Sequence, residues 1–364
     1  MACSAKPYSR QGCDAEMINL RDKGADAWAK WDRPRRVVFV LAAISVVASL
    51  PFAGNFSVSN ILNTPVSSYA DVLVYPVGMF VLMALGLNIV VGKSGMLDLG
   101  YVAFFAIGAY SMGILGTHTH LNMWEILPIG MGLAMIAGVL LGIPTLRLRG
   151  DYLAIVTMGF GEIVRITALN TNKIGGPNGI ANVPNPPTVL GLHFNITTPN
   201  SFFWLILTLI LLTIWMIRRL SVRRPGRAWE AIRQDEDAAE LMGVPTLKYK
   251  IWAFVLGAGV GGAAGVVYAS KTLFISPEAF TFNISVLILS CVVFGGIGNI
   301  WGVVLGGVFL AYLPERIRFV TNARQLVFGL TLVIIMNFRP DGILPRKKRE
   351  KVLASKDSSG GKNV

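Results

Sequence analysis

The sequence predicts an all-α protein, a polytopic transmembrane bundle of about ten helices, some of them broken or short. Hydrophobic residues make up 53% of the 364 residues and charged residues 15%, whereas a soluble domain carries about 25% charged residues. The apolar residues also occur in blocks long enough to cross a bilayer. The 39 glycines are typical of membrane helices that pack closely or are broken. These observations argue against a large soluble enzyme.

The apolar blocks give the expected spans in chain order. A spanning helix needs roughly 20 residues, so the shorter blocks predict short or tilted helices. The blocks cover residues 37–53, 72–91, 97–115, 123–143, 152–170, 201–217, 251–270, 284–298, 300–313 and 323–338.

Positive charge gives the orientation of these spans. The formal net charge is +13, and Lys and Arg gather before residue 37, between 218 and 250, and after 338. Loops that face inward carry the excess of Lys and Arg in membrane proteins, so both termini and the loop 218–250 are expected in the cytoplasm. This placement explains the basic charge without a nucleic-acid partner. Only a few of these residues fall in loops on the other side: Lys173, Lys271, Arg316, Arg318 and Arg324.

Three regions follow from this map. Residues 1–36 form a basic cytoplasmic extension that contains no signal peptide and has no assigned role. Residues 37–338 form the transmembrane domain. Residues 339–364 form a basic cytoplasmic tail, and its Gly- and Ser-rich end is expected to be disordered.

Cysteine and histidine spacing predicts no metal site, no disulfide and no catalytic residue. Cys3, Cys13 and Cys291 are scattered along the chain, and the three histidines lie far from cysteines and from acidic clusters. We expect neither a metal nor a cofactor.

The loop 218–250 is expected to contain one short helix. Helix-forming residues fill Arg227 to Met242 between a Pro225–Gly226 start and a Gly243 end. Four apolar side chains fall on one arc of this helix and form a stripe: Trp229, Ile232, Ala239 and Met242. Composition alone leaves two interpretations open. The stripe could fit a groove on a partner protein, or the helix could be a solvated loop element.

Charged groups within a span are functional candidates. Glu162 and Arg165 are three residues apart and so share a helix face, and ionisable groups at membrane depth usually face the interior. They could fix helix packing as an ion pair or take part in transport. Arg165 could also reach the outer interface. Asp98 and Asp151 precede apolar runs and are expected to cap helices, with substrate contact as the less favoured role of Asp98.

Glycine-rich stretches mark expected breaks in the spans. The sequence FGGIGNIWG from Phe294 contains Gly296 and Asn299 and is expected to face the bundle interior. GAGVGGAAG from Gly257 fits close helix packing at least as well. GGPNGI, with Gly175, Gly176 and Asn178, predicts a tight turn in an outside loop. That turn could be scaffold or a docking edge.

Several long motifs in one order carry a resemblance to a known family. GRAWEAIRQDEDAAELMGV from Gly226 resembles the cytoplasmic coupling segment of permeases in the branched-chain amino-acid ABC importer family. The resemblance extends from about residue 78 to residue 345, through SGMLDLGYVAFFAIGAY, GDYLAIVTMGFGEIVRI, GGPNGI, GGIGNIWGVVLGGVFL and LVFGLTLVIIMNFRPDGIL. The ending FRPDGI resembles the longer of the two paired permeases.

The resemblance implies a permease in the bacterial cytoplasmic membrane that works with partners. These are a second permease, two ATP-binding subunits and an extracytoplasmic substrate-binding protein. It implies that residues 218–250 are the coupling loop, with these coupling residues: Gly226, Arg227, Trp229, Glu230, Ile232, Arg233, Ala239, Met242 and Gly243. The candidate pathway or gating residues are Glu162, Arg165, Asp98, Gly175, Gly176, Asn178, Gly296 and Asn299.

Other function classes fit the sequence less well. The chain has no GxxxxGK[ST] motif, so a partner must hydrolyse ATP if import is ATP-driven. An ion-coupled secondary transporter would favour several interior carboxylates, and the spans offer little beyond Glu162. A membrane enzyme would need clustered acids or a nucleophile with a base. Branched-chain amino acids, other amino acids, and urea or short amides remain open as substrates.

Overall fold

The computed structural model describes most of the central chain: residues 69–119, 121–145, 151–188, 194, 199–316, 329–330, 333 and 342–344. They all lie within one compact unit, Leu62–Val364. The expected block 37–53, most of the block 323–338, the extension 1–36 and the end of the tail lie outside the described residues.

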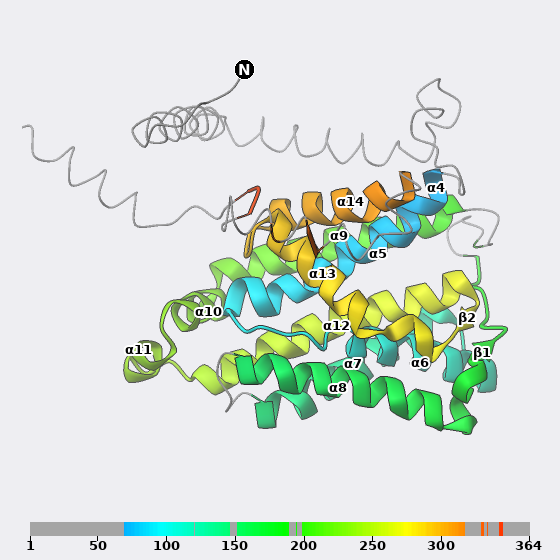
Figure 1. Cartoon of the computed structure of the whole chain (residues 1–364), viewed down its shortest axis with the longest axis horizontal. Coiled ribbons are helices and arrows are strands. Elements are labelled where there is room, and N and C mark those ends of the chain that lie inside the picture. Colours follow the sequence, from blue (N-terminus) through cyan, green and yellow to red (C-terminus); the bar gives the residue numbers. More distant parts are fainter. Residues whose placement is uncertain are drawn as a thin grey trace, which may run out of the picture. The chain divides into compact units, whose positions relative to one another are not determined.

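The described residues are almost entirely helical, as predicted (Figure 1). In chain order the elements are α4 (Tyr69–Val72), η2 (Leu73–Gly78), α5 (Met79–Leu87), η3 (Asn88–Lys93), α6 (Val102–His118), α7 (Met123–Thr145), α8 (Asp151–Asn170), η4 (Asn172–Ile174), η5 (Gly176–Asn178), β1 (Ile180–Ala181), α9 (Pro199–Val222), α10 (Arg224–Gln234), α11 (Glu236–Leu241), α12 (Thr246–Thr272), β2 (Phe274–Ile275), η6 (Pro277–Phe280), α13 (Phe282–Gly295) and α14 (Ile300–Arg316).

Each apolar block within the described ranges became a helix. Five helical stretches there are long and apolar enough to cross a membrane: Leu73–Lys93, Met123–Thr145, Tyr152–Asn170, Asn200–Val222 and Thr246–Thr272. Shorter apolar helices cover Val102–His118, Phe282–Gly295 and Ile300–Leu313. The expectation of a polytopic helix bundle with some short helices is therefore confirmed.

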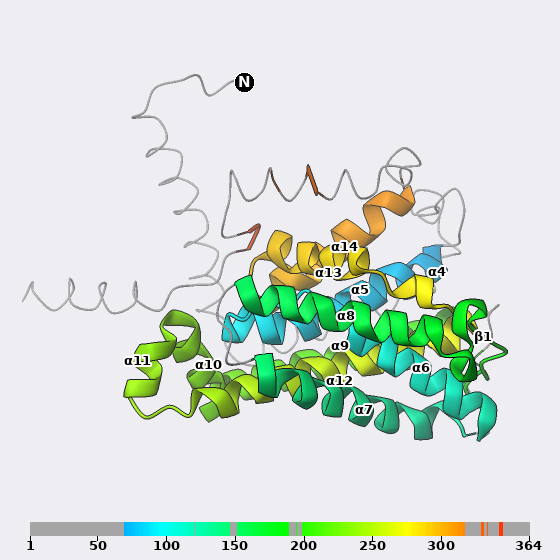
Figure 2. The same ribbon diagram turned by 60° about the horizontal axis from the view of Figure 1, so that its bottom comes forward.

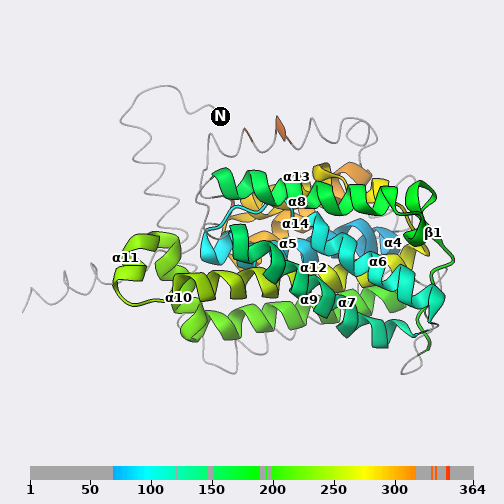
Figure 3. The ribbon, with the colours of Figure 1, turned by 90° about the horizontal axis from the view of Figure 1, so that it is seen from below.

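Helix α12 lies at the centre of the bundle and packs against α5, α6 and α7 (Figure 3). Glycines allow this close approach. A Cβ atom added to Gly265 would lie 2.1 Å from the carbonyl oxygen of Phe105, and one added to Gly108 would lie 2.1 Å from that of Gly262. The stretch from Gly257 therefore packs helices closely, as small residues do in membranes.

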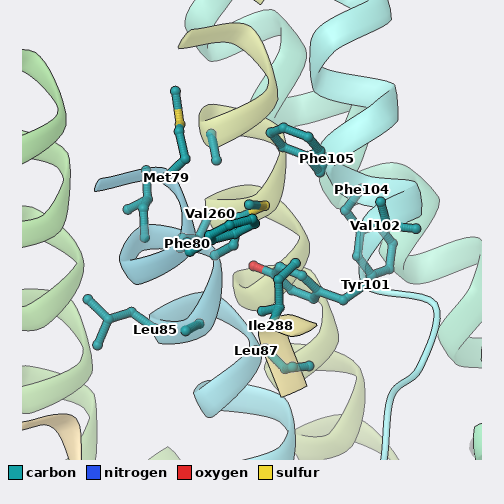
Figure 4. Close-up of a cluster of buried hydrophobic side chains, with 14 of the residues drawn as sticks. Met79, Phe80, Leu85, Leu87, Tyr101, Val102, Phe104, Phe105, Val260 and Ile288 are labelled. Atoms are coloured by element: carbon teal, nitrogen blue, oxygen red, sulfur yellow. The ribbon is translucent and has the colours of Figure 1, made fainter. Parts of the chain in front are cut away.

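Large apolar side chains fill the core between α5, α6, α12 and α13 (Figure 4). Phe80, Phe104 and Val260 are all buried there. The hydroxyl of the buried Tyr101 donates a hydrogen bond to the carbonyl oxygen of Gly257 over 2.8 Å. This bond satisfies the one polar group that the ring brings into the core.

A two-stranded antiparallel sheet closes one end of the bundle. Strand β1 pairs with β2 with Ile180 opposite Ile275, so the segment after α8 is tied to the segment after α12. Helices α10 and α11 lie at the opposite end (Figures 1 and 2). The long helices α8, α9 and α12 connect the two ends.

Candidate functional site

The loop between α9 and α12 folds as two helices joined at an elbow, where the sequence predicted one helix from Arg227 to Met242. Helix α10 ends at Gln234 and α11 begins at Glu236. Between them Asp235 is extended, with φ −158° and ψ 115°, and its carboxylate accepts a hydrogen bond from the Ala238 N–H. An aspartate that caps the next helix competes with continuation of the previous one. The single-helix prediction is therefore wrong at Asp235.

The apolar stripe of this loop packs mainly on the chain's own helices. Trp229, Ile232 and Ala239 are each at most 5% exposed, and α10 packs against α9, α12 and η3. The indole Nε1–H of Trp229 donates to the carbonyl oxygen of Tyr249 over 2.7 Å. Met242, in contrast, is 86% exposed. The two interpretations left open by the sequence, a stripe that fits a partner's groove as a whole and a solvated loop helix, are both corrected, because most of the stripe is buried against this chain's own helices.

A partly buried ion pair holds α11 against α12. Lys250, 4% exposed, donates from Nζ to the Glu236 carboxylate. A buried ammonium requires such a partner. Sequence reasoning missed this pair, because a lysine at the cytoplasmic start of an apolar run is common in membrane proteins and gives no sign that its side chain is buried.

Other side chains form the outward face of the elbow. Leu241 is 89% exposed and follows the exposed Asp237, Ala238 and Glu240. Arg227 and Gly243 are also exposed, while Glu230 is half-buried. Position 226 requires glycine for a structural reason, because a Cβ there would lie 2.4 Å from the Cα atom of Ser221. The chain can therefore turn back from α9 into α10.

Arg233 connects α10 to the end of the first described span. Its guanidinium Nη1 donates to the carbonyl oxygen of Gly92 in η3. Its aliphatic stem packs on Gly95, which has a φ of +78°, and a Cβ added to Gly95 would lie 2.9 Å from Arg233 Cγ. Only glycine combines that backbone conformation with that approach. The loop and the break after η3 are therefore in direct contact.

The same break meets the turn between α13 and α14. The backbone N–H of Gly298 donates to the Asn88 side-chain oxygen over 3.0 Å, and Gly296 and Gly298 both have positive φ values. Asn299 donates from Nδ2 to the carbonyl oxygen of Leu344 over 2.8 Å. Two predicted pathway residues thus lie in a turn that is linked to Arg233 through η3. Sequence reasoning missed Asn88, a lone amide within the apolar block 72–91.

Asp98 lies in the break but does not cap α6. The N-cap position is Tyr101, without a side-chain hydrogen bond, so the expected capping role is wrong. Asp98 is 1% exposed, and its Oδ1 accepts from the Gly100 N–H over 2.9 Å. Within the part of the chain that the structure describes, its buried Oδ2 has no hydrogen-bond partner. As for Asp151, α8 begins at that residue itself.

Glu162 and Arg165 form the predicted pair but not in the interior of this chain. Arg165 Nε donates to the two carboxylate oxygens of Glu162 over 2.9 and 3.0 Å. The side chains of Glu162 and Arg165 are 42% and 23% exposed. The pairing follows from their spacing on α8, whereas the expectation of an interior position is corrected.

The GGPNGI segment forms the tight turn that the sequence predicted. Gly175, Gly176 and Gly179 all have positive φ values, and a Cβ added to Gly175 would lie 2.4 Å from the Gly179 carbonyl oxygen. Asn178 is exposed. This turn leads into β1, so these residues lie at the end of the bundle opposite the elbow (Figure 1).

The predicted residues therefore fall into three places. The coupling residues, Gly296 and Asn299 gather around η3 and the elbow, and Asp98 lies in the adjoining break. The pair on α8 and the turn at Gly175 lie elsewhere. Within the described residues, no group of three or more His, Cys, Asp or Glu side chains could hold a metal ion.

Comparisons with known proteins identify relatives along most of the chain. Residues 69–336 match the family described as "Branched-chain amino acid transport system / permease component". The high-affinity branched-chain amino acid transport system permease protein LivM of Escherichia coli K12 is 42% identical over 304 residues, 78% of this chain and 71% of LivM.

More distant relatives carry similar names. The probable branched-chain amino acid transport permease protein LivM of Methanocaldococcus jannaschii is 26% identical over 319 residues, 74% of this chain and 91% of that protein. The high-affinity permease protein LivH of Escherichia coli K12 is 31% identical over 160 residues, 43% of this chain and 51% of LivH. No solved structure matches the chain.

Proposed function

Because the chain belongs to the family of branched-chain amino-acid transport permease components, we propose that it forms part of the translocation pathway of an ATP-driven importer for branched-chain or related amino acids. The observation that carries this proposal is the match over residues 69–336. The chain is a multi-pass membrane protein, and its long apolar helices provide the walls that such a pathway needs.

The importer would contain a second permease, two ATP-binding subunits and an extracytoplasmic substrate-binding protein. Two relatives from Escherichia coli K12, LivM and LivH, carry the name of the same transport system as separate permease proteins. This supports a pairing of two different permeases. The absence of a GxxxxGK[ST] motif from the sequence supports ATP hydrolysis by a partner.

The elbow of α10 and α11 would receive the signal from the ATP-binding subunits. Its outward face offers Leu241 and Met242 among charged side chains. Its inward face is fixed to α12 by Trp229 and Lys250, and Arg233 connects it to η3. A displacement of the elbow would therefore reach both the central helix and the break that contains Asp98.

The orientation that we propose places the elbow and both termini in the cytoplasm of a bacterium, and the turn at Gly175 outside. The concentration of Lys and Arg in the loop 218–250 supports it. Single cysteines at Asn185 and Gln234, both exposed, test it in a variant that lacks the native cysteines. An impermeant thiol reagent should label the first position and spare the second in intact cells. The reverse pattern would refute the orientation.

Uptake in whole cells tests the function itself. Deletion of this permease should abolish high-affinity uptake of radiolabelled leucine, and the intact chain should restore it. Excess isoleucine or valine should compete, and urea or acetamide should not. Depletion of ATP should stop uptake while an ionophore that collapses ion gradients should not. Competition by urea would shift the substrate to small amides, and sensitivity to the ionophore alone would favour a secondary transporter.

A further inference from the structure

Helix α8 lies on the outside of the bundle and leaves much of its surface uncovered (Figure 2). Only 28% of the most apolar 18-residue stretch of α8 is buried within the chain. Tyr152, Ile155 and Ile163 are each more than 60% exposed. Something other than this chain's described helices must cover this face in the membrane.

The ion pair on this face lies deep in the span. Glu162 follows Tyr152, the first residue of the candidate span Tyr152–Asn170, by about 15 Å along the helix at about 1.5 Å per residue. It precedes Asn170, the last residue, by about 12 Å. Both groups are therefore within the hydrocarbon region of a bilayer about 30 Å thick. Charged groups at that depth almost always face protein or water, and these two are partly exposed.

Helix α7 shows what a lipid-facing helix of this chain looks like. It is of similar length and also mostly uncovered, with 33% of its most apolar 18-residue stretch buried. After Glu125, the exposed side chains of α7 are all apolar, among them Ile129, Leu133, Ile136, Leu140 and Ile143. No charged residue follows Glu125 in α7. Hydrocarbon solvates this face at no cost, whereas the face of α8 presents a carboxylate and a guanidinium to its surroundings.

Two further features of the α8 face suit a neighbouring helix. Gly159 is exposed between Ile155 and Ile163, and a Cβ added to it would meet nothing within 4 Å. Such a notch between bulky side chains lets another helix approach closely. In addition, η6 packs against α8 and carries the exposed carboxylate of Glu278. This surface therefore offers shape and charge to a partner along a whole span.

We propose that the outer face of α8, defined by Tyr152, Ile155, Gly159, Glu162, Ile163 and Arg165, is the surface on which the second permease packs. The Glu162–Arg165 pair then borders the pathway between two permeases and does not face lipid. The proposal rests on the proposed function, which supplies the partner. The occupant is a different polytopic chain of the same family whose facing helix carries polar groups, because such a chain covers a full span and also satisfies the charges, and because the relatives LivM and LivH carry the name of one transport system as separate permease proteins.

Photocrosslinking in the intact complex tests this surface. A benzoylphenylalanine at Ile155 or Ile163, 65% and 63% exposed, should form an adduct with the second permease in native membranes. The matched controls are Ile136 and Leu140 of α7, 58% and 67% exposed, which should give no protein adduct. Mass spectrometry identifies each adduct. If the α8 positions react with lipid alone, with a second copy of this chain or with other segments of the same chain, the proposal is overturned.

The charges provide an independent readout. Glu162→Gln or Arg165→Met leaves one charge unpaired at depth, and each should reduce recovery of the second permease with this chain by at least about tenfold. The double variant should recover part of that loss. Recovery that is unchanged in both single variants would also overturn the proposal.

Leucine uptake in the same cells separates the two levels of inference. If the second permease copurifies and uptake is normal but α8 gives no adduct with it, the surface is wrong and the function stands. If no second permease copurifies and uptake is absent in unsubstituted cells, the proposed function fails and this surface fails with it.

Discussion

Helices α12 and α8 are both long apolar helices, but they occupy opposite kinds of position. The most apolar 18-residue stretch of α12 is 78% buried, and the corresponding stretch of α8 is 28% buried. Helix α12 presents glycines to its neighbours, so that backbones meet almost directly. Helix α8 presents isoleucines and an ion pair outward. The difference teaches that the glycines of α12 let its neighbours approach closely, whereas α8 leaves large and charged side chains on the outside of the bundle for other molecules to cover.

Overpacking the centre should have the largest effect. In Gly265→Leu the new Cβ would lie 2.1 Å from the Phe105 carbonyl oxygen and 2.6 Å from the Ala109 nitrogen, both backbone atoms. We expect a loss of stability of about 3 kcal/mol or more, at or above the upper end for overpacking. Thermal unfolding in detergent and the yield of folded protein measure it.

The control is Gly132→Ala in α7, where an added Cβ meets nothing within 4 Å. That variant should unfold at the original temperature or slightly above it, since alanine favours helix. Equal losses in the two variants would show that the centre and the periphery do not differ in this way.

Breaking the ion pair that holds the elbow to α12 should have an intermediate effect. Glu236→Gln leaves the ammonium of Lys250 buried without its partner, and we expect a loss of about 2 kcal/mol. Lys250→Met should cost less, because Glu236 is the more exposed partner and can turn toward water. Thermal unfolding of both variants and of the double variant tests this order. The reverse order would mean that the ammonium finds another partner.

The two faces of the elbow should respond differently to a new charge. Leu241→Asp, on the exposed face, should change stability by less than about 0.5 kcal/mol and yet weaken binding of the proposed ATP-binding subunits. Ile232→Asp, on the buried face, should destabilise the chain itself. Copurification and thermal unfolding separate the two effects. Unchanged copurification and uptake in Leu241→Asp would move the coupling contact elsewhere.

The smallest effects are expected on the surfaces of α7 and α8. Ile136→Ala and Ile163→Ala remove similar side chains that are 58% and 63% exposed. Each should change the stability of the isolated chain by less than about 0.5 kcal/mol. Only Ile163→Ala should lower recovery of the second permease. A loss of recovery in Ile136→Ala of the same size would remove the distinction between the two faces.

The spans could be predicted because their signal is local. An apolar block of about 20 residues has few alternatives to a membrane helix, and the blocks within the described ranges all became helices. The turn at Gly175 was predictable for the same reason. Glycine adopts positive φ values at little energetic cost, so a cluster of glycines marks a tight turn locally in the sequence. The pairing of Glu162 with Arg165 follows from helical spacing alone.

The tertiary partners could not be predicted in the same way. Periodicity placed Trp229 and Ile232 on one face, but it did not show that α9 and α12 cover that face. The environment of Asp98 includes Thr157, whose hydroxyl oxygen accepts from the neighbouring Leu99 N–H across 58 positions of the chain. Nothing near Asn88 in the sequence reveals the Gly298 N–H. Such contacts depend on how helices are arranged, which no local pattern records.

The length of α12 has a mechanical consequence. Its 27 residues make a rod of about 40 Å. The start of this rod is bound to the elbow through the Tyr249 carbonyl group and Lys250. Its other end continues after Leu273 into the small sheet. If such a rod tilts by about 3° around its middle, each end moves by about 1 Å, and the two ends move in opposite directions. The helix would then act as a lever that pivots at its middle. A displacement of the elbow in one direction would move the small sheet at the other end of α12 in the opposite direction.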